Sequence, residues 1–98
     1  MSDYQAPVRQ MRFTIEHLAD FPAVKALPDF AAVDGDTVDA VLEEAAKFAT
    51  NVLAPINWLG DRQGVQVVDR AVQVPQEFTD AYKQFCEAGW PGIASNPE

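Results

Sequence analysis

Residues 37–59, which read TVDAVLEEAAKFATNVLAPINWL, decide the fold of this chain. Their apolar side chains recur every three or four residues for about five turns, which is the spacing of one helical face. These are Val38, Val41, Leu42, Ala45, Phe48, Ala49, Val52, Leu53 and Ile56. Charged and polar residues occupy much of the remaining circumference. The pattern predicts a long amphipathic helix over residues 37–60.

Both ends of this predicted helix carry recognisable signals. The turn formed by residues 34–36 precedes it, and Asp36 is a suitable N-cap, with Asp39 at the capping-box position. Pro55 lies inside the periodic pattern, where it lacks an N–H and clashes with the carbonyl four residues earlier. We therefore expect a kink or break near residues 51–54, with the helix continuing to Gly60.

Three further segments have weaker helical patterns. Residues 7–19 favour a helix with Pro7 at its first position, although alternation between residues 11 and 16 would also suit a strand. Residues 21–27 predict a short helix capped by Asp20 and stopped by Pro28. Residues 76–88 predict a last helix, which Pro75 opens and Gly89 terminates. Together with the long helix, these segments predict an all-α fold, a small bundle of about four helices.

Residues 65–74 alternate weakly between apolar and polar side chains. This pattern favours either a short hairpin or an extended excursion between the helices.

Composition limits what the chain can do. It has 98 residues, enough for one small domain, and 48% of them are hydrophobic, so a collapsed core is expected. The net charge of −8, with no basic stripe, argues against nucleic acids and against docking on anionic membranes. No apolar run is long enough for a membrane span, and no N-terminal signal core is apparent. The sequence therefore predicts a cytoplasmic globular domain.

Candidate reactive side chains are few. His17 is the only histidine and Cys86 the only cysteine, so the chain lacks the ligands of a structural zinc site. No nucleophile stands in a recognisable setting for His17 to activate. The apolar residues around Cys86 favour packing over reactivity.

Other polar and aromatic patterns have simpler structural explanations. The turn at residues 34–36 departs from a calcium-binding loop at its later ligand positions, so a turn with an N-cap is the better interpretation. The adjacent Glu43 and Glu44 diverge on a helix and do not form a carboxylate pair. Trp58 and Trp90 could stack on a ligand, but large aromatic residues more often supply core area. These residues identify no catalytic, cofactor-binding or metal site.

Several fragments of the sequence, taken in order, match a known family. They are YQAPV and MRF in residues 4–13, VLEEAAKFA at 41–49, VLAPIN at 52–57, GDRQG at 60–64, VP at 74–75, Tyr82 and GWPG at 89–92. In this order they resemble the N-terminal helical domain of bacterial acyl-CoA dehydrogenases. The likeness extends over nearly the whole chain and is greatest to the branch that includes 3-methylmercaptopropionyl-CoA dehydrogenases.

The resemblance implies a flavoprotein parent. Such enzymes bind FAD and remove hydrogens from Cα and Cβ of an acyl-CoA thioester, with a glutamate as base. They pass electrons to an electron-transfer flavoprotein and are usually homo-oligomers. Their helical N-terminal domain is followed by a β-domain and a C-terminal helical bundle.

The chain departs from this family pattern after residue 98, where a family member would continue into the flavin-binding β-domain. The resemblance therefore predicts that residues 1–98 are an incomplete piece, inactive alone and without bound FAD, whose partners are the remaining domains. No residue here matches a catalytic or cofactor-binding position of the family. The alternative is an autonomous, acidic helical module that binds another protein.

Overall fold

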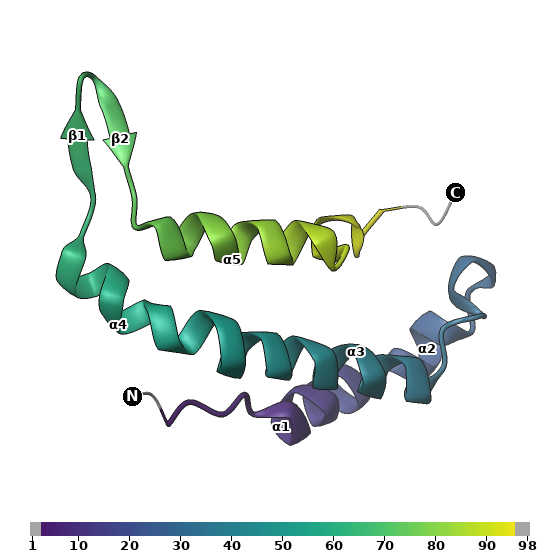
Figure 1. Cartoon of the computed structure of the whole chain (residues 1–98). Coiled ribbons are helices and arrows are strands. Elements are labelled where there is room, and N and C mark those ends of the chain that lie inside the picture. The colour runs from purple at the N-terminus through teal and green to yellow at the C-terminus, as the bar shows by residue number, and fades with distance from the viewer. Residues whose placement is uncertain (1–2, 96–98) are drawn as a thin grey trace. The chain divides into compact units, whose positions relative to one another are not determined.

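The computed structural model describes residues 3–95, which divide into two compact units. The first unit comprises residues 3–51 and the second comprises residues 52–95. Helices dominate both, with one small two-stranded hairpin in the second unit (Figure 1). The predicted all-α bundle class is confirmed.

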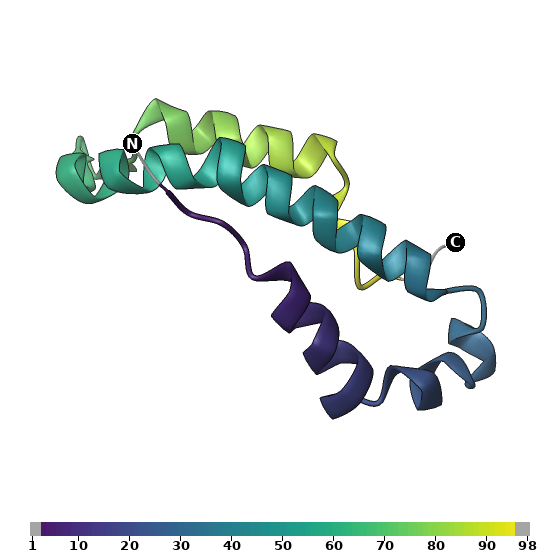
Figure 2. The same cartoon turned by 90° about the horizontal axis from the view of Figure 1, so that it is seen from below.

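The first unit is a helical hairpin-like arrangement, in which the chain reverses direction between its first and last helices. It contains α1 (Val8–Phe13), the π-helical turn η1 (Thr14–Leu18), α2 (Phe21–Lys25), the 3-10 turn η2 (Pro28–Phe30) and α3 (Gly35–Phe48). After α1 and η1 the chain turns through α2 and η2, and α3 runs back in the opposite direction (Figure 2). Helices α1 and α3 are in contact.

The segment at residues 7–19 is helical, as predicted, and the strand alternative is wrong. Its second half is a π-helix, with the Ala19 N–H donating to the carbonyl of Thr14 at 2.9 Å. The Thr14 hydroxyl donates to the carbonyl of Gln10, also at 2.9 Å. This side chain competes for a carbonyl within the helix, a known reason for a helix to depart from regular geometry.

The long helix begins two residues earlier than predicted, and the predicted N-cap is wrong. Asp34, not Asp36, is the cap: its backbone is extended and its side chain accepts a hydrogen bond from the Thr37 N–H. Asp36 lies within the first turn. Asp20 does precede α2, but with a left-handed backbone and without a side-chain capping bond.

The predicted irregularity before Pro55 is present. Helix α3 ends at Phe48, the π-helical turn η3 spans Ala49–Leu53, and α4 spans Ala54–Gln63 with Pro55 in its first turn. A proline is tolerated there because the N–H groups of a first helical turn have no partner within that helix. The π-helical turn is thus how the chain stays helical on both sides of Pro55.

The second unit consists of α4, the hairpin strands β1 (Gln66–Val68) and β2 (Ala71–Gln73), α5 (Gln76–Glu87) and the 3-10 turn η4 (Trp90–Gly92). The hairpin alternative for residues 65–74 is therefore confirmed. Its strands are antiparallel, and the hairpin projects beyond the ends of α4 and α5, which are in contact (Figure 1). Gly89 adopts a left-handed backbone conformation just after α5, as is usual for a glycine that ends a helix.

The collapsed core expected from composition is not found in the described residues. Their buried positions are Ala81 and Pro75, both in the second unit. Trp58 is 64% exposed, so it does not supply core area, and Cys86 is exposed rather than packed.

The helices were also compared with the requirements of a membrane span. Among residues 3–95, no helix combines the length and the apolar character that crossing a bilayer requires.

The contact between α4 and α5 depends on the absence of a side chain at Gly60. A Cβ atom at this position would overlap the Phe78 ring, lying 2.9 Å from Cε1 and closer still to Cζ. Because Gly60 sits within α4, it costs helix stability relative to alanine. Its value here lies in letting the aromatic ring pack against the helix backbone.

We predict that Gly60→Ala destabilises the chain by about 1–3 kcal/mol, because the added methyl group displaces the Phe78 ring. In a Phe78→Ala background the same change should be neutral or stabilising, since only the helix propensity remains. Urea unfolding of the two single variants and the double variant measures this coupling. Equal effects of Gly60→Ala in both backgrounds would show that the ring does not constrain position 60.

Candidate functional site

The candidate residues from the sequence do not converge on a site. His17 is exposed in η1, and its ring lies 4.7 Å from the Phe13 ring, centroid to centroid. Cys86 lies in α5, in the other unit. Within residues 3–95, no three histidine, cysteine or carboxylate side chains are grouped to hold a metal ion.

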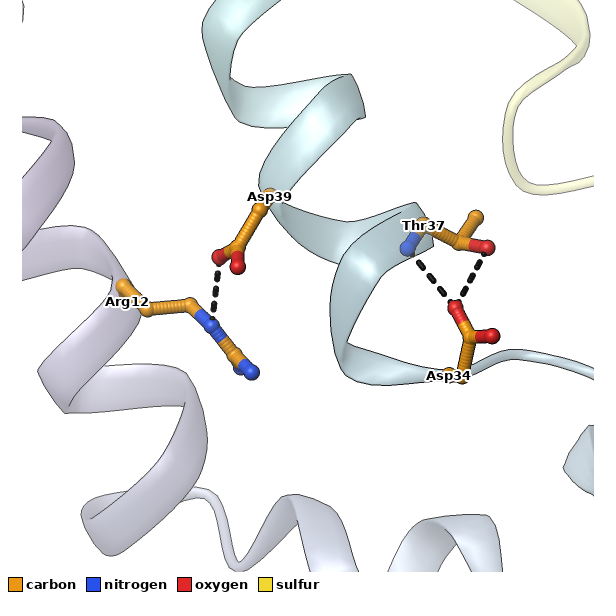
Figure 3. Close-up of polar contacts among 4 residues, drawn as sticks. All are labelled: Arg12, Asp34, Thr37 and Asp39. Carbon is orange, nitrogen blue, oxygen red and sulfur yellow. Dashed lines mark hydrogen bonds and ion pairs between the residues drawn. The ribbon is translucent and has the colours of Figure 1, made fainter.

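The most developed polar cluster lies where α1 meets the start of α3. Arg12 Nε is 2.7 Å from Asp39 Oδ1, an ion pair between the two helices (Figure 3). One turn earlier, Asp34 Oδ1 accepts two hydrogen bonds from Thr37, from its N–H and from its hydroxyl, both at 2.8 Å. Asp39 does not complete the predicted capping box; instead it pairs with Arg12.

Arg12 is held from several sides. Its side chain is only 23% exposed, its guanidinium lies 5.7 Å from the centroid of the Phe21 ring, and Gly35 leaves room for Nη2. A Cβ atom on Gly35 would lie 2.7 Å from that nitrogen. Nη1 is enclosed and has no hydrogen-bond acceptor among the described residues. These contacts join α1, α2 and the first turn of α3.

Sequence reasoning missed this cluster, although one signal was available. Arg12 follows Val8 by four residues and precedes Ile15 by three, so it occupies a position on the apolar face of its helix. A charged residue at such a position needs a partner. The sequence does not show which of the many carboxylates supplies it.

An open apolar groove lies beside this cluster, between α1 with its π-helical extension and α3. It has a volume of about 460 Å³ and is lined by Pro7, Gln10, Met11, Thr14, Ile15 and Leu42. The lining offers aliphatic contact surface and carries no charged side chain. The groove is suited to packing and contains no group for acid–base or nucleophilic chemistry.

Aromatic and polar contacts in the second unit are local to single helices. The Arg62 guanidinium lies 4.8 Å from the centroid of the Trp58 ring, and the Tyr82 and Phe85 rings stack at 6.2 Å. A side-chain hydrogen bond with Cys86, followed by an electrostatic contribution from the same residue, raises the pKa of Tyr82. A raised pKa keeps the phenol protonated at neutral pH, so Tyr82 is not an activated base.

Comparisons with known proteins say more about the family of this chain than the geometry of its side chains does. Over 97% of its length, the chain is 37% identical to the 3-methylmercaptopropionyl-CoA dehydrogenase of Ruegeria pomeroyi. Over 89% of its length, it is 30% identical to the butyryl-CoA dehydrogenase of Syntrophomonas wolfei. No protein-family model matches the chain.

These matches confirm the resemblance to acyl-CoA dehydrogenases that the sequence fragments predicted. The chain spans only 16% and 15% of the lengths of these two relatives.

We predict that acid weakens α3 through Asp34. Its two hydrogen bonds from Thr37, chiefly that from the backbone N–H, lower the pKa of Asp34 below its ordinary value of 3.8. The carboxylate therefore stabilises the folded state fully above the unfolded pKa, and this contribution is lost as the pH falls through the lower folded pKa. Asp34→Ala should lower stability at neutral pH and flatten the loss below about pH 4.

Circular dichroism during thermal unfolding between pH 2.5 and 7 would measure this effect. Asp36→Ala is the matched control, because Asp36 lies in the same turn but does not cap the helix. If the two variants show the same pH dependence, the Asp34 cap is not its source.

Proposed function

We propose that residues 1–98 form the N-terminal helical domain of an FAD-dependent acyl-CoA dehydrogenase. The observation that carries this proposal is the 37% identity to 3-methylmercaptopropionyl-CoA dehydrogenase, which extends over 97% of the chain. The complete enzyme would remove hydrogens from Cα and Cβ of an acyl-CoA thioester. Its electrons would pass to an electron-transfer flavoprotein, and the enzyme would act in the cytoplasm as a homo-oligomer.

Within that enzyme, the role of this domain is to wall the acyl and flavin region and to support the domains that hold it. The exposed apolar side chains support such a packing role. Met11 and Leu18 in the first unit, and Trp58 and Tyr82 in the second, are between 39% and 76% exposed. Large apolar side chains left exposed in both units are available to pack against other protein.

FAD itself does not fit the described residues as its principal binding site. No glycine-rich phosphate loop is present in residues 3–95. Three of the cations already have neighbours in this chain: Arg12 pairs with Asp39, Lys47 with Glu44, and Arg62 stacks on Trp58. The proposal therefore assigns flavin binding and catalysis to the remainder of the enzyme and no catalytic role to residues of this chain.

A second candidate is an autonomous acidic module that binds another protein. The observation in its favour is that the same exposed apolar faces would suit a partner helix. The two candidates differ in whether the natural polypeptide continues beyond residue 98 and in whether flavin accompanies it.

We predict that the polypeptide carrying these residues continues into a flavin-binding region. Expressed in full, it should be yellow, contain about one FAD per chain, and reduce an artificial electron acceptor when given an acyl-CoA. Butyryl-CoA and 3-methylmercaptopropionyl-CoA are suitable probes, since they are the compounds named for the two relatives. A natural polypeptide that ends at residue 98, or a longer one without flavin, would support the interaction module instead.

We predict that the 98-residue chain alone is colourless and does not oxidise acyl-CoA. The physical reason is that residues 3–95 contain no glycine-rich phosphate loop for the flavin pyrophosphate. Visible absorbance after incubation with FAD and gel filtration, with bovine serum albumin as a control for nonspecific retention, measures it. Stoichiometric flavin on the 98-residue chain would overturn this assignment.

A further inference from the structure

The hairpin presents one face made entirely of valine. In its register Val67 lies opposite Val72, and Gln66 lies opposite Gln73. Because side chains alternate along a strand, Val65 and Val74 lie on the same face as the Val67–Val72 pair, at the open end of the hairpin. The other face carries the two glutamines, together with Val68 and Ala71.

The valine face is exposed. Val67 is 72% and Val72 is 66% exposed, and Val65 and Val74 are 62% and 45% exposed. No residue of the hairpin strands is buried. A two-stranded hairpin of this size is marginally stable in water unless its apolar face packs on something.

The turn of the hairpin does not provide the stability that packing of the valine face would give. Asp69 and Arg70 both adopt left-handed backbone conformations, with φ of 52° and 67°. A two-residue hairpin turn with this geometry favours asparagine and glycine, and a residue with a larger side chain such as Arg70 is disfavoured there. The hairpin is therefore held in a conformation that its own turn residues resist, which is what a segment stabilised by outside packing would show.

The size of the face indicates what covers it. A stable interface between separate chains buries about 800 Å² on each partner, and four valine side chains offer far less than that. A surface within the same polypeptide needs much less contact area. The covalent link between the two surfaces already removes most of the entropy that separate chains lose when they associate. The relatives are about six times as long as the matched segment, so such a surface is available if the proposed function is correct.

We propose that the valine face of the hairpin (Val65, Val67, Val72 and Val74) docks onto an uncharged aliphatic surface elsewhere in the same polypeptide. The inference rests on the proposed function, since it places the docking surface in the remainder of the enzyme. The hairpin then joins this domain to that remainder. The glutamine face stays in water.

Variants of the full-length polypeptide that each carry one added cysteine in the hairpin test this proposal. Val67→Cys and Gln66→Cys are neighbours on opposite faces, so each is the matched control for the other. The rate of alkylation by iodoacetamide, followed by mass spectrometry of the hairpin peptide, should be roughly tenfold slower at Val67→Cys than at Gln66→Cys. In urea the two rates should agree.

Equal rates at the two positions in the native protein would overturn the proposal. Protection of Val67→Cys that disappears on dilution would also overturn it, since the occupant would then be a second copy. Should either variant fail to fold, hydrogen exchange of the wild-type hairpin amides is the second measurement. Slow exchange of these amides supports docking, and exchange at the rate of an unstructured peptide contradicts it.

The flavin content of the same preparation separates the two claims. A flavin-containing enzyme with equal alkylation rates would retain the proposed function and refute the docking of the hairpin. A longer polypeptide without flavin, in which Val67→Cys is protected at all concentrations, would refute the proposed function and support the docking.

Discussion

The inability of Pro55 to continue a regular α-helix is the constraint on which the rest of the chain depends. Its nitrogen carries no hydrogen, and in a regular helix its ring would collide with the carbonyl of Asn51. The chain meets this constraint with the π-helical turn Ala49–Leu53, after which α4 starts with Pro55 in its first turn. The boundary between the two units falls within that turn, between Asn51 and Val52.

Within each unit, contacts between helices are few and specific. In the first unit, Arg12 connects α1 to the first turn of α3 through Asp39. In the second, the Phe78 ring packs against α4 at Gly60. An exposed ion pair contributes little to stability, and that of Arg12 is only partly shielded because Asp39 is 53% exposed. These contacts specify how the helices meet more than they supply the apolar burial that normally stabilises a domain.

The scarcity of burial bears on function. A self-contained domain of this composition would be expected to place its large apolar side chains inside, yet Leu18, Trp58 and Tyr82 are largely exposed. Perturbed acids and bases arise where side chains are withdrawn from water, and few side chains in residues 3–95 are withdrawn in this way. The chain is similar to acyl-CoA dehydrogenases over about a sixth of their length, and the proposed function would place this surface against other parts of the enzyme.

The sequence by itself determined the elements of this chain. The periodicity of residues 38–56 specified the long helix, Pro55 its irregularity, Gly89 the end of α5, and alternation the hairpin. These signals are local. The side-chain pattern of a helix or a strand repeats every few residues, and proline and glycine change the backbone conformations allowed at their own positions.

Only the tertiary structure decided how side chains from different elements are used. The sequence has several aspartates near the start of α3, and the cap predicted from it was Asp36, whereas the structure gives that place to Asp34. Contact with α1 drew Asp39 to Arg12, while Thr37 supplied Asp34 with two donors. The need for glycine at position 60, and the exposure of Trp58 and Cys86, likewise depend on what lies opposite each residue in space. Local pattern carries no information about those neighbours, because they come from segments distant along the chain.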